Sequence, residues 1–193
     1  MSDTPAPASN QAPVVNQAQP WRGGWRQGLN YGALGLPLAF VALPLYVSLP
    51  NHYATEYGVP LALLGALLLG ARLLDAVVDP FIGRWVDALF GVSALRAWRI
   101  AALAAIVLAA GFAGLFLPPL KAGAALLWWC GAMLVATYLA YSVVTVVHQA
   151  WGARLGGDEP QRARVVAWRE GLALAGVLVA SVLPSVEIGR AHV

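Results

Sequence analysis

The sequence predicts an all-α membrane protein, and two observations support this. Of its 193 residues, 60% are hydrophobic and 11% are charged, whereas soluble domains carry about 25% charged residues. The apolar residues also gather in about five stretches, each near the roughly 20 residues that a helix needs to cross a bilayer. We therefore expect a multi-pass protein of the cell inner (plasma) membrane.

The chain begins with a polar tail, residues 1–20, which is rich in Pro, Ala, Gln, Asn and Ser. This composition is typical of disorder, and the lack of an apolar run does not fit a signal peptide. A partial transmembrane bundle is expected over residues 21–187. The residues expected to anchor its first span at the membrane interface are Trp21, Arg22, Trp25 and Arg26.

Hydropathy divides the bundle into its spans in order. The first apolar run contains several prolines, the second is rich in Leu, the third in Ala, the fourth carries hydroxyl groups, and the fifth is rich in Val, Leu and Ala. The expected helices are 29–49, 60–83, 98–117, 122–151 and 166–184. The glycines expected to be close-packing sites are Gly65, Gly70, Gly111, Gly114, Gly171 and Gly176.

The basic residues predict the orientation of the bundle. The net charge is +3, and nearly all basic residues lie before the first span or around the second and fourth connections: Arg22, Arg26, Arg84, Arg96, Arg99, Arg154, Arg162, Arg164 and Arg169. Only Lys121 lies in the other connections. Since basic loops stay cytoplasmic, we expect a cytoplasmic N-terminus. Because the basic residues sort by membrane side, no nucleic-acid partner is expected.

The last residues interrupt the apolar pattern of the fifth span. Glu187-Ile-Gly-Arg-Ala-His-Val193 matches one reading frame of a common short-read sequencing adapter, and the stop codon of that frame falls where the chain ends. We therefore expect residues 188–193 to be a non-native, adapter-encoded tail. Arg190 and His192 are given no function, and the chain is expected to be an N-terminal fragment.

Three charged residues lie inside the second apolar run. Arg72, Asp75 and Asp79 follow at steps of three and four residues, which places them on one face of a helix. Charges at membrane depth are costly and usually line a substrate or ion path. The alternative is a structural salt bridge, but two carboxylates to one arginine favour function. Arg72 is expected to neutralise Asp75.

This stripe predicts coupling to an ion. Carboxylate oxygens suit hard cations such as Na⁺, and in a low dielectric a carboxylate can instead take up a proton. We therefore expect Asp75 and Asp79, with Arg72, to couple transport to H⁺ or Na⁺. No cofactor is expected, and no metal other than Na⁺ at the two aspartates.

The fourth span carries a second polar surface. Its hydroxyl-bearing residues recur at steps of three and four and are expected to line a cavity together with Tyr31 of the first span: Tyr138, Tyr141, Ser142 and Thr145. Such residues also serve as packing contacts between membrane helices, and this alternative stays open.

The combined pattern resembles a known family. Tyr31-Gly32, then Ala71-Arg72-x-x-Asp75-Ala76-x-x-Asp79-Pro80-x-x-Gly83, is similar to the glycoside-pentoside-hexuronide:cation symporters of the major facilitator superfamily. The resemblance implies the N-terminal portion of a major facilitator fold, about five of twelve expected helices. It also implies cation binding by the two aspartates and a cytoplasmic gate formed by Gly83, Asp87, Gly91 and Arg96.

Some positions depart from the family pattern. Ala39 stands where the family's melibiose permease has a sugar-binding aspartate, and Val78 stands where it has an amide that helps to bind Na⁺. The fourth span offers Ser142 and Thr145 in place of a second sugar-binding aspartate. Proton coupling survives these losses better than Na⁺ coupling, and a solute less polar than a glycoside is plausible.

We therefore predict a secondary active transporter that couples symport of a small, sugar-like organic solute to a cation or proton, and not an enzyme. Its partners are membrane lipid, the solute and the missing C-terminal half of its own chain. One alternative is a membrane-embedded, metal-dependent phosphotransferase, which the four-residue steps Asp75, Asp79, Gly83 and Asp87 suggest. That match fails because such enzymes have an Ala-Arg pair between their aspartates, whereas here Ala71-Arg72 precedes all of them. The other alternative is a non-transporting membrane scaffold.

Overall fold

The structure is a computed structural model that describes the backbone of residues 24–191 and the side chains of residues 24–182. Its described part is entirely helical, with α1 (Trp25–Gly32), α2 (Gly35–Leu43), the π-helical turn η1 (Pro44–Ser48), α3 (Leu49–Tyr57), α4 (Leu61–Val92), α5 (Ala94–Phe116), α6 (Gly123–Leu155) and α7 (Glu159–Ala191). The predicted tail 1–20, with Trp21, Arg22 and His192, lies outside the described residues, as does the side chain of Arg190.

Within the described residues, five helices are long and apolar enough to cross a membrane. They are Trp25–Tyr57, Leu61–Val92, Ala94–Phe116, Gly123–Leu155 and Glu159–Val182. Most extend beyond the apolar runs because their ends carry the polar residues that a hydropathy window leaves out. The predicted all-α membrane fold is confirmed.

The first span is interrupted twice by proline. Pro37 has no N–H for the carbonyl of Ala33, and α1 ends just before that residue. At Pro44 the helix widens into η1, where the N–H of Leu49 donates to the carbonyl of Pro44 five residues earlier. The span ends at Gly58, whose φ of 64° is a left-handed conformation that favours glycine.

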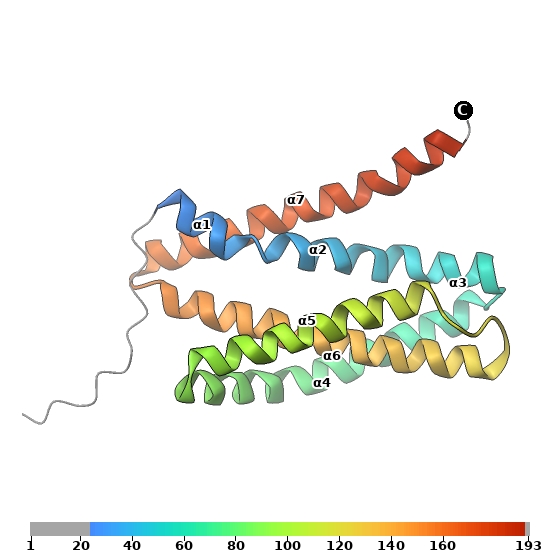
Figure 1. Cartoon of the computed structure of the whole chain (residues 1–193), viewed down its shortest axis with the longest axis horizontal. Helices are drawn as coiled ribbons and strands as arrows, with labels where there is room; N and C mark the ends of the chain where they lie inside the picture. The colour runs from blue at the N-terminus through green and yellow to red at the C-terminus, as the bar shows by residue number, and fades with distance from the viewer. Residues whose placement is uncertain (1–23, 192–193) are drawn as a thin grey trace, which may run out of the picture.

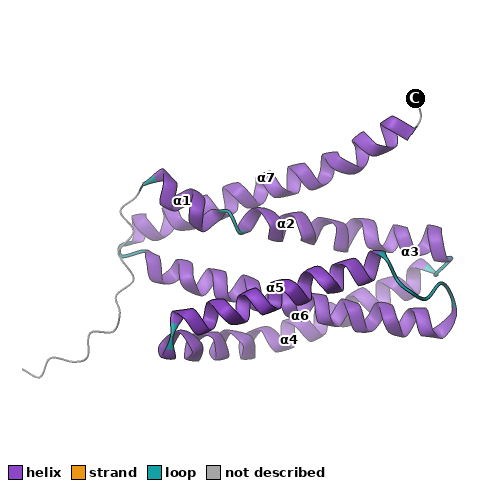
Figure 2. Ribbon diagram, in the orientation of Figure 1, coloured by secondary structure: helices purple, strands orange, loops and turns teal. Residues whose placement is uncertain are grey.

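The spans form two groups that lie against each other (Figure 1). The first span and α7 run side by side in one group, and α4, α5 and α6 form the other. Figure 2 shows that short loops and turns join the helices. Within each group, part of each helix surface packs against a neighbouring helix, while large apolar side chains also remain exposed on the outer faces.

Glycines allow the first span to approach α7 closely. A Cβ at Gly32 would lie 2.6 Å from the carbonyl oxygen of Trp168, and one at Gly35 would lie 2.8 Å from that of Arg169. From the opposite side, a Cβ at Gly176 would overlap the carbonyl oxygen of Leu36. Backbone therefore packs on backbone here, as is typical of small residues between membrane helices.

At three of the predicted close-packing glycines the described residues make no close contact. A Cβ at Gly65, Gly70 or Gly171 would have no described atom of a neighbouring helix within 4 Å, and all three positions are exposed. The predicted close packing is present at Gly111, where a Cβ would overlap the hydroxyl of Thr137, and at Gly176. Spacing within one helix did not identify which face meets a neighbour.

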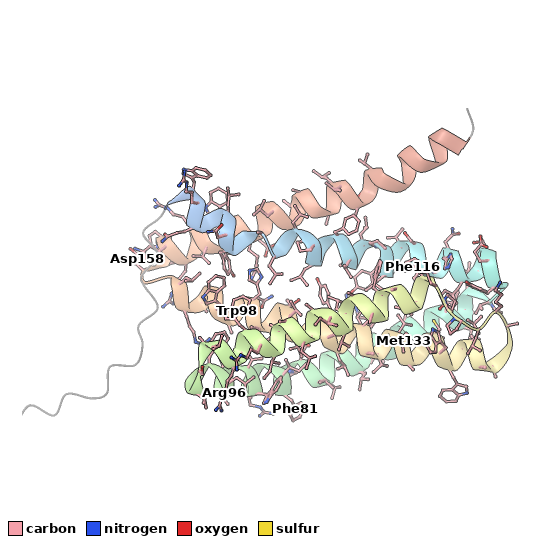
Figure 3. The ribbon with its side chains drawn as sticks, in the orientation of Figure 1. Phe81, Arg96, Trp98, Phe116, Met133 and Asp158 are labelled. Atoms are coloured by element: carbon pink, nitrogen blue, oxygen red, sulfur yellow. The ribbon has the colours of Figure 1, made fainter. Side chains whose placement is uncertain are left out.

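Both ends of the bundle have a distinct character. The α4–α5 and α6–α7 connections lie at the end where α1 begins, and the α3–α4 and α5–α6 connections lie at the other (Figure 1). Figure 3 places Arg96, Trp98 and Asp158 toward the first end, and Phe116 and Met133 toward the second. The arginine-rich connections thus share one end of the bundle, as the alternation of five spans requires.

Candidate functional site

The charged stripe lies on α4, whose outward face is apolar. Leu69, Leu73, Val77 and Phe81 are 60–63% exposed, whereas Asp75 is only 6% exposed. α4 continues through Pro80, which lacks an N–H for the carbonyl of Ala76. The helix therefore turns its lipid-compatible residues outward and Asp75 inward, toward α6.

Asp75 is held by two partners from two different spans. The Oγ of Ser142 on α6 donates a hydrogen bond to Oδ1 of Asp75 at 2.6 Å. Nη1 of Arg72, one turn earlier on α4, donates to Oδ2 at 3.3 Å. Both carboxylate oxygens thus have a donor, and the expected pairing of Arg72 with Asp75 is present in the geometry.

Arg72 also contacts two aromatic rings. Its guanidinium carbon lies 4.4 Å from the ring centroid of Tyr46 and 5.3 Å from that of Tyr138. The two rings are stacked at 6.1 Å with an interplanar angle of 26°. A cation near ring faces is stabilised by the ring quadrupole, so the first span, through Tyr46, helps to hold Arg72.

Tyr46 was not among the residues predicted for the site. It lies in the π-helical turn η1, which begins at Pro44. Such turns often occur at functional sites because they change the direction of side chains. Pro44 and Pro50 on either side of Tyr46 were the available sequence signal.

Asp79 lies one turn beyond Asp75 in a different environment. Its Oδ1 is buried and has no hydrogen-bond partner among the described residues. On α6, Thr145 lies one turn beyond Ser142, and its Oγ1 is likewise buried without a partner. Because α4 and α6 run in the same direction (Figure 1), Asp79 and Thr145, each about one turn beyond the Asp75–Ser142 hydrogen bond, lie at a similar level.

Two further predicted cavity residues lie on the same side of α6. Tyr138 is buried, and its hydroxyl has no hydrogen-bond partner among the described residues. Tyr141 is close enough to Arg72 and Asp75 to interact with them electrostatically. The structure therefore brings together Arg72, Asp75, Tyr138, Tyr141 and Ser142, with Asp79 and Thr145 one turn away.

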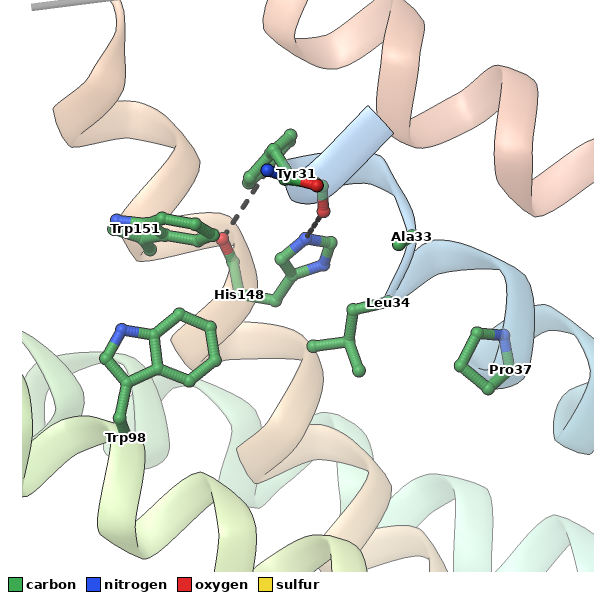
Figure 4. Close-up of a pocket in the computed structure, with 8 residues that line it drawn as sticks. Tyr31, Ala33, Leu34, Pro37, Trp98, His148 and Trp151 are labelled. Carbon is green, nitrogen blue, oxygen red and sulfur yellow. Dashed lines mark hydrogen bonds between the residues drawn. The ribbon is translucent and has the colours of Figure 1, made fainter. Parts of the chain in front are cut away.

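Tyr31 does not join this cluster. It is buried near the end of α1, against His148 and Trp151 of α6. These residues, with Trp98 of α5, line a separate cavity of about 470 Å³ (Figure 4). The separation follows from position along the first span: Tyr31 lies near its start, and Tyr46 lies 15 residues later, about 22 Å further along at 1.5 Å per residue.

The residues predicted for a gate lie at the arginine-rich end. Oδ1 of Asp87 accepts a hydrogen bond from Nη2 of Arg154 at 3.2 Å, and the Arg154 guanidinium lies 4.3 Å from the ring centroid of Phe90. Gly91 and Arg96 are exposed nearby, and Gly83 is half-buried. Asp87 thus ties the end of α4 to the end of α6, using an arginine that the prediction did not include.

The atoms of the site that could bind a cation are carboxylate and hydroxyl oxygens. Within the part of the chain that the structure describes, no three His, Cys, Asp or Glu side chains come together as metal ligands. An ion at Asp79 would therefore depend on a carboxylate together with hydroxyl or backbone oxygens, which is the ligand chemistry of hard cations.

The model of one protein family, described as MFS/sugar transport protein, matches residues 28–191. The chain belongs to this family. The predicted resemblance to sugar and cation symporters of the major facilitator superfamily (MFS) is thereby confirmed. So is the prediction that its helices form part of an MFS fold.

A curated relative of this MFS chain is the inner membrane symporter YicJ of Escherichia coli (strain K12). The two are 28% identical over 159 residues, which cover 81% of this chain and 33% of the relative. The MFS chain thus spans about a third of the length of that symporter. The comparison with solved structures gave no significant match.

Proposed function

We propose that this chain is the N-terminal part of a secondary active transporter, in which Asp75 and Asp79 couple symport of a small organic solute to H⁺ or Na⁺. One observation carries the proposal. In a membrane-spanning helix, Asp75 has donors on both carboxylate oxygens, whereas the buried Oδ1 of Asp79 has none among the described residues.

The difference between the two aspartates suggests different roles. An unpaired buried acceptor costs about 1–3 kcal/mol, and more when it is charged. A proton or a Na⁺ at Asp79 removes that cost, so this carboxylate has a reason to bind and release an ion. Asp75, already compensated by Arg72 and Ser142, orients the cluster and joins α4 to α6.

The solute is proposed to bind beside the same cluster. Arg72 is about half exposed, and Tyr46 is 37% exposed. The guanidinium has more N–H donors than Asp75 uses, so it can also donate to solute hydroxyl groups. A sugar-like solute fits this mixed polar and aromatic surface and the family's description as sugar transport proteins.

The cellular setting follows from the same proposal. The curated relative is named an inner membrane symporter, and we place this chain in the inner membrane with the arginine-rich end and the N-terminus cytoplasmic. Alternating access requires two halves that move about a shared site. The partner that completes the site is proposed to be the C-terminal half of the full-length protein.

The experiment is uptake of labelled monosaccharides and disaccharides by the full-length protein in vesicles under an imposed H⁺ or Na⁺ gradient. We expect accumulation driven by one of these gradients and its loss in Asp75→Asn and Asp79→Asn. Accumulation that survives both changes would contradict the roles of the two carboxylates. The gradient that drives uptake identifies the ion.

The phosphotransferase alternative needs Asp87 to join the other aspartates. Its side chain is instead 70% exposed and paired with Arg154. Magnesium-dependent phosphotransfer by the purified full-length protein, without gradient-driven uptake, would favour that alternative.

A further inference from the structure

The first span is broken near the end where the chain begins. α1 ends at Gly32, α2 begins at Gly35, and Pro37 provides no N–H for the carbonyl of Ala33. Carbonyls in the last turn of a helix lack intrahelical donors and need other partners. In a membrane those partners must come from the protein or from a cavity.

His148 supplies such a partner from another span. Its side chain is 1% exposed, and its Nε2 lies 2.8 Å from the main-chain carbonyl oxygen of Tyr31. A carbonyl only accepts, so Nε2 carries a proton and donates this hydrogen bond (Figure 4). His148 therefore binds the last turn of α1, immediately before the break.

The contact is reciprocal. The Tyr31 hydroxyl donates to the carbonyl oxygen of His148 at 3.5 Å, and the two rings are 4.5 Å apart. The hydroxyl occupies the space left by Gly152, where a Cβ would overlap it. The long Tyr31 bond is the weaker of the two, so the bond donated by His148 is the stronger polar contact at this end of the first span; at the other end, His52 Nε2 lies 3.2 Å from the carbonyl oxygen of Phe116 on α5.

This link joins the two groups of helices. α1 and α2 pack closely on α7, whereas α6 belongs with α4 and α5. The same α6 donates from Ser142 to Asp75 and from His148 to Tyr31. The first span, in turn, continues from the break to Tyr46, which lies at Arg72.

We propose that His148 is a positioning residue that holds the broken first span against α6 and thereby keeps Tyr46 at Arg72. Its consequence for transport rests on the proposed function. The link itself does not, because it concerns the arrangement of two helix groups.

A distance measurement tests this on the 193-residue chain in lipid nanodiscs. Cys130→Ala removes the one native cysteine, and spin labels at Trp25→Cys on α1 and Leu103→Cys on α5 report on the two groups. Both positions are exposed. The variants compared in this background are His148→Leu, His148→Gln, Tyr31→Phe and the neighbouring exposed control Gln149→Leu.

In the labelled Cys130→Ala chain with His148 intact, we expect a single narrow distribution of distances between the two labels. We expect His148→Leu to broaden this distribution, although leucine fills a similar volume to histidine. His148→Gln, whose amide can still donate to Tyr31, is expected to keep it, as is Gln149→Leu. Tyr31→Phe retains the main-chain carbonyl and is also expected to keep it.

Three results would overturn the proposal. The first is a distance distribution that is unchanged in His148→Leu. The second is a distribution in His148→Gln as broad as that in His148→Leu, and the third is a distribution in Tyr31→Phe that is equally broad. If His148→Leu does not fold, His148→Gln decides, since a broadened distribution there rejects the hydrogen bond as the link and an unchanged one supports it. The distances need no transport, so this failure is distinct from failure of gradient-driven uptake.

Discussion

The hydrogen bond from Ser142 to Asp75 joins two membrane spans, and Ser142→Ala removes it while leaving the carboxylate in place. The Oγ to Oδ1 distance is 2.6 Å, and both residues are buried. The distance lies within the range of well-formed O–H···O hydrogen bonds.

Two magnitudes bound the expected effect. Hydrogen bonds to charged groups contribute about 1.5–3 kcal/mol in proteins generally, whereas bonds between membrane helices average about 0.6 kcal/mol. Arg72 still compensates Asp75 after the change, although at 3.3 Å and from a half-exposed position. We therefore expect Ser142→Ala to lower the free energy of unfolding by about 1–2 kcal/mol.

A double-mutant cycle with Asp75→Ala, which removes the acceptor, isolates this bond from the loss of the hydroxyl itself. Reversible unfolding in mixed micelles supplies the four free energies. Ser181→Ala is the matched control, because Ser181 is exposed and donates within its own helix to the carbonyl of Val177, and it should change stability by less than about 0.5 kcal/mol. A coupling energy within about 0.3 kcal/mol of zero would refute the reasoning.

Three further predictions concern packing, the arginine and the isolated chain. Gly32→Ala places a Cβ 2.6 Å from the Trp168 carbonyl oxygen and should cost about 1–3 kcal/mol of unfolding free energy in micelles. Gly65→Ala, with no atom within 4 Å, should not destabilise; equal losses would contradict the packing account. Arg72→Gln removes the cation near the Tyr46 ring, so a double-mutant cycle with Tyr46→Leu should show a coupling of about 0.5–1 kcal/mol; a coupling near zero would show that the ring contact is incidental. The 193-residue chain alone should show no uptake in vesicles, because alternating access needs both halves; uptake would refute this.

The sequence was sufficient for features that depend on one helix. Apolar runs located the five spans, and the step from Arg72 to Asp75 predicted a pair that the structure brings within 3.3 Å. The length of each apolar run locates a span, and helical periodicity places Arg72 and Asp75 on one face, so neither needs knowledge of neighbouring spans.

Contacts between spans could not be predicted in this way. Tyr46 reaches Arg72 because the span widens at η1, and His148 reaches Tyr31 because the same span is broken at Ala33 and Leu34. Tyr31 was grouped with the hydroxyls of α6, yet it lies near the start of its span and lines another cavity. The prolines marked the irregular positions, but only the packing of α6 and α7 determined where each side chain points.

Ion movement that accompanies solute entry tests the central claim most directly. Proteoliposomes with the full-length protein, no imposed gradient and an H⁺- or Na⁺-sensitive dye inside would receive a transported sugar. The account predicts a solute-induced ion influx that is abolished in Asp79→Asn, while Ser181→Ala retains it. An influx of unchanged size in Asp79→Asn would show that the carboxylate of Asp79 is not the coupling group.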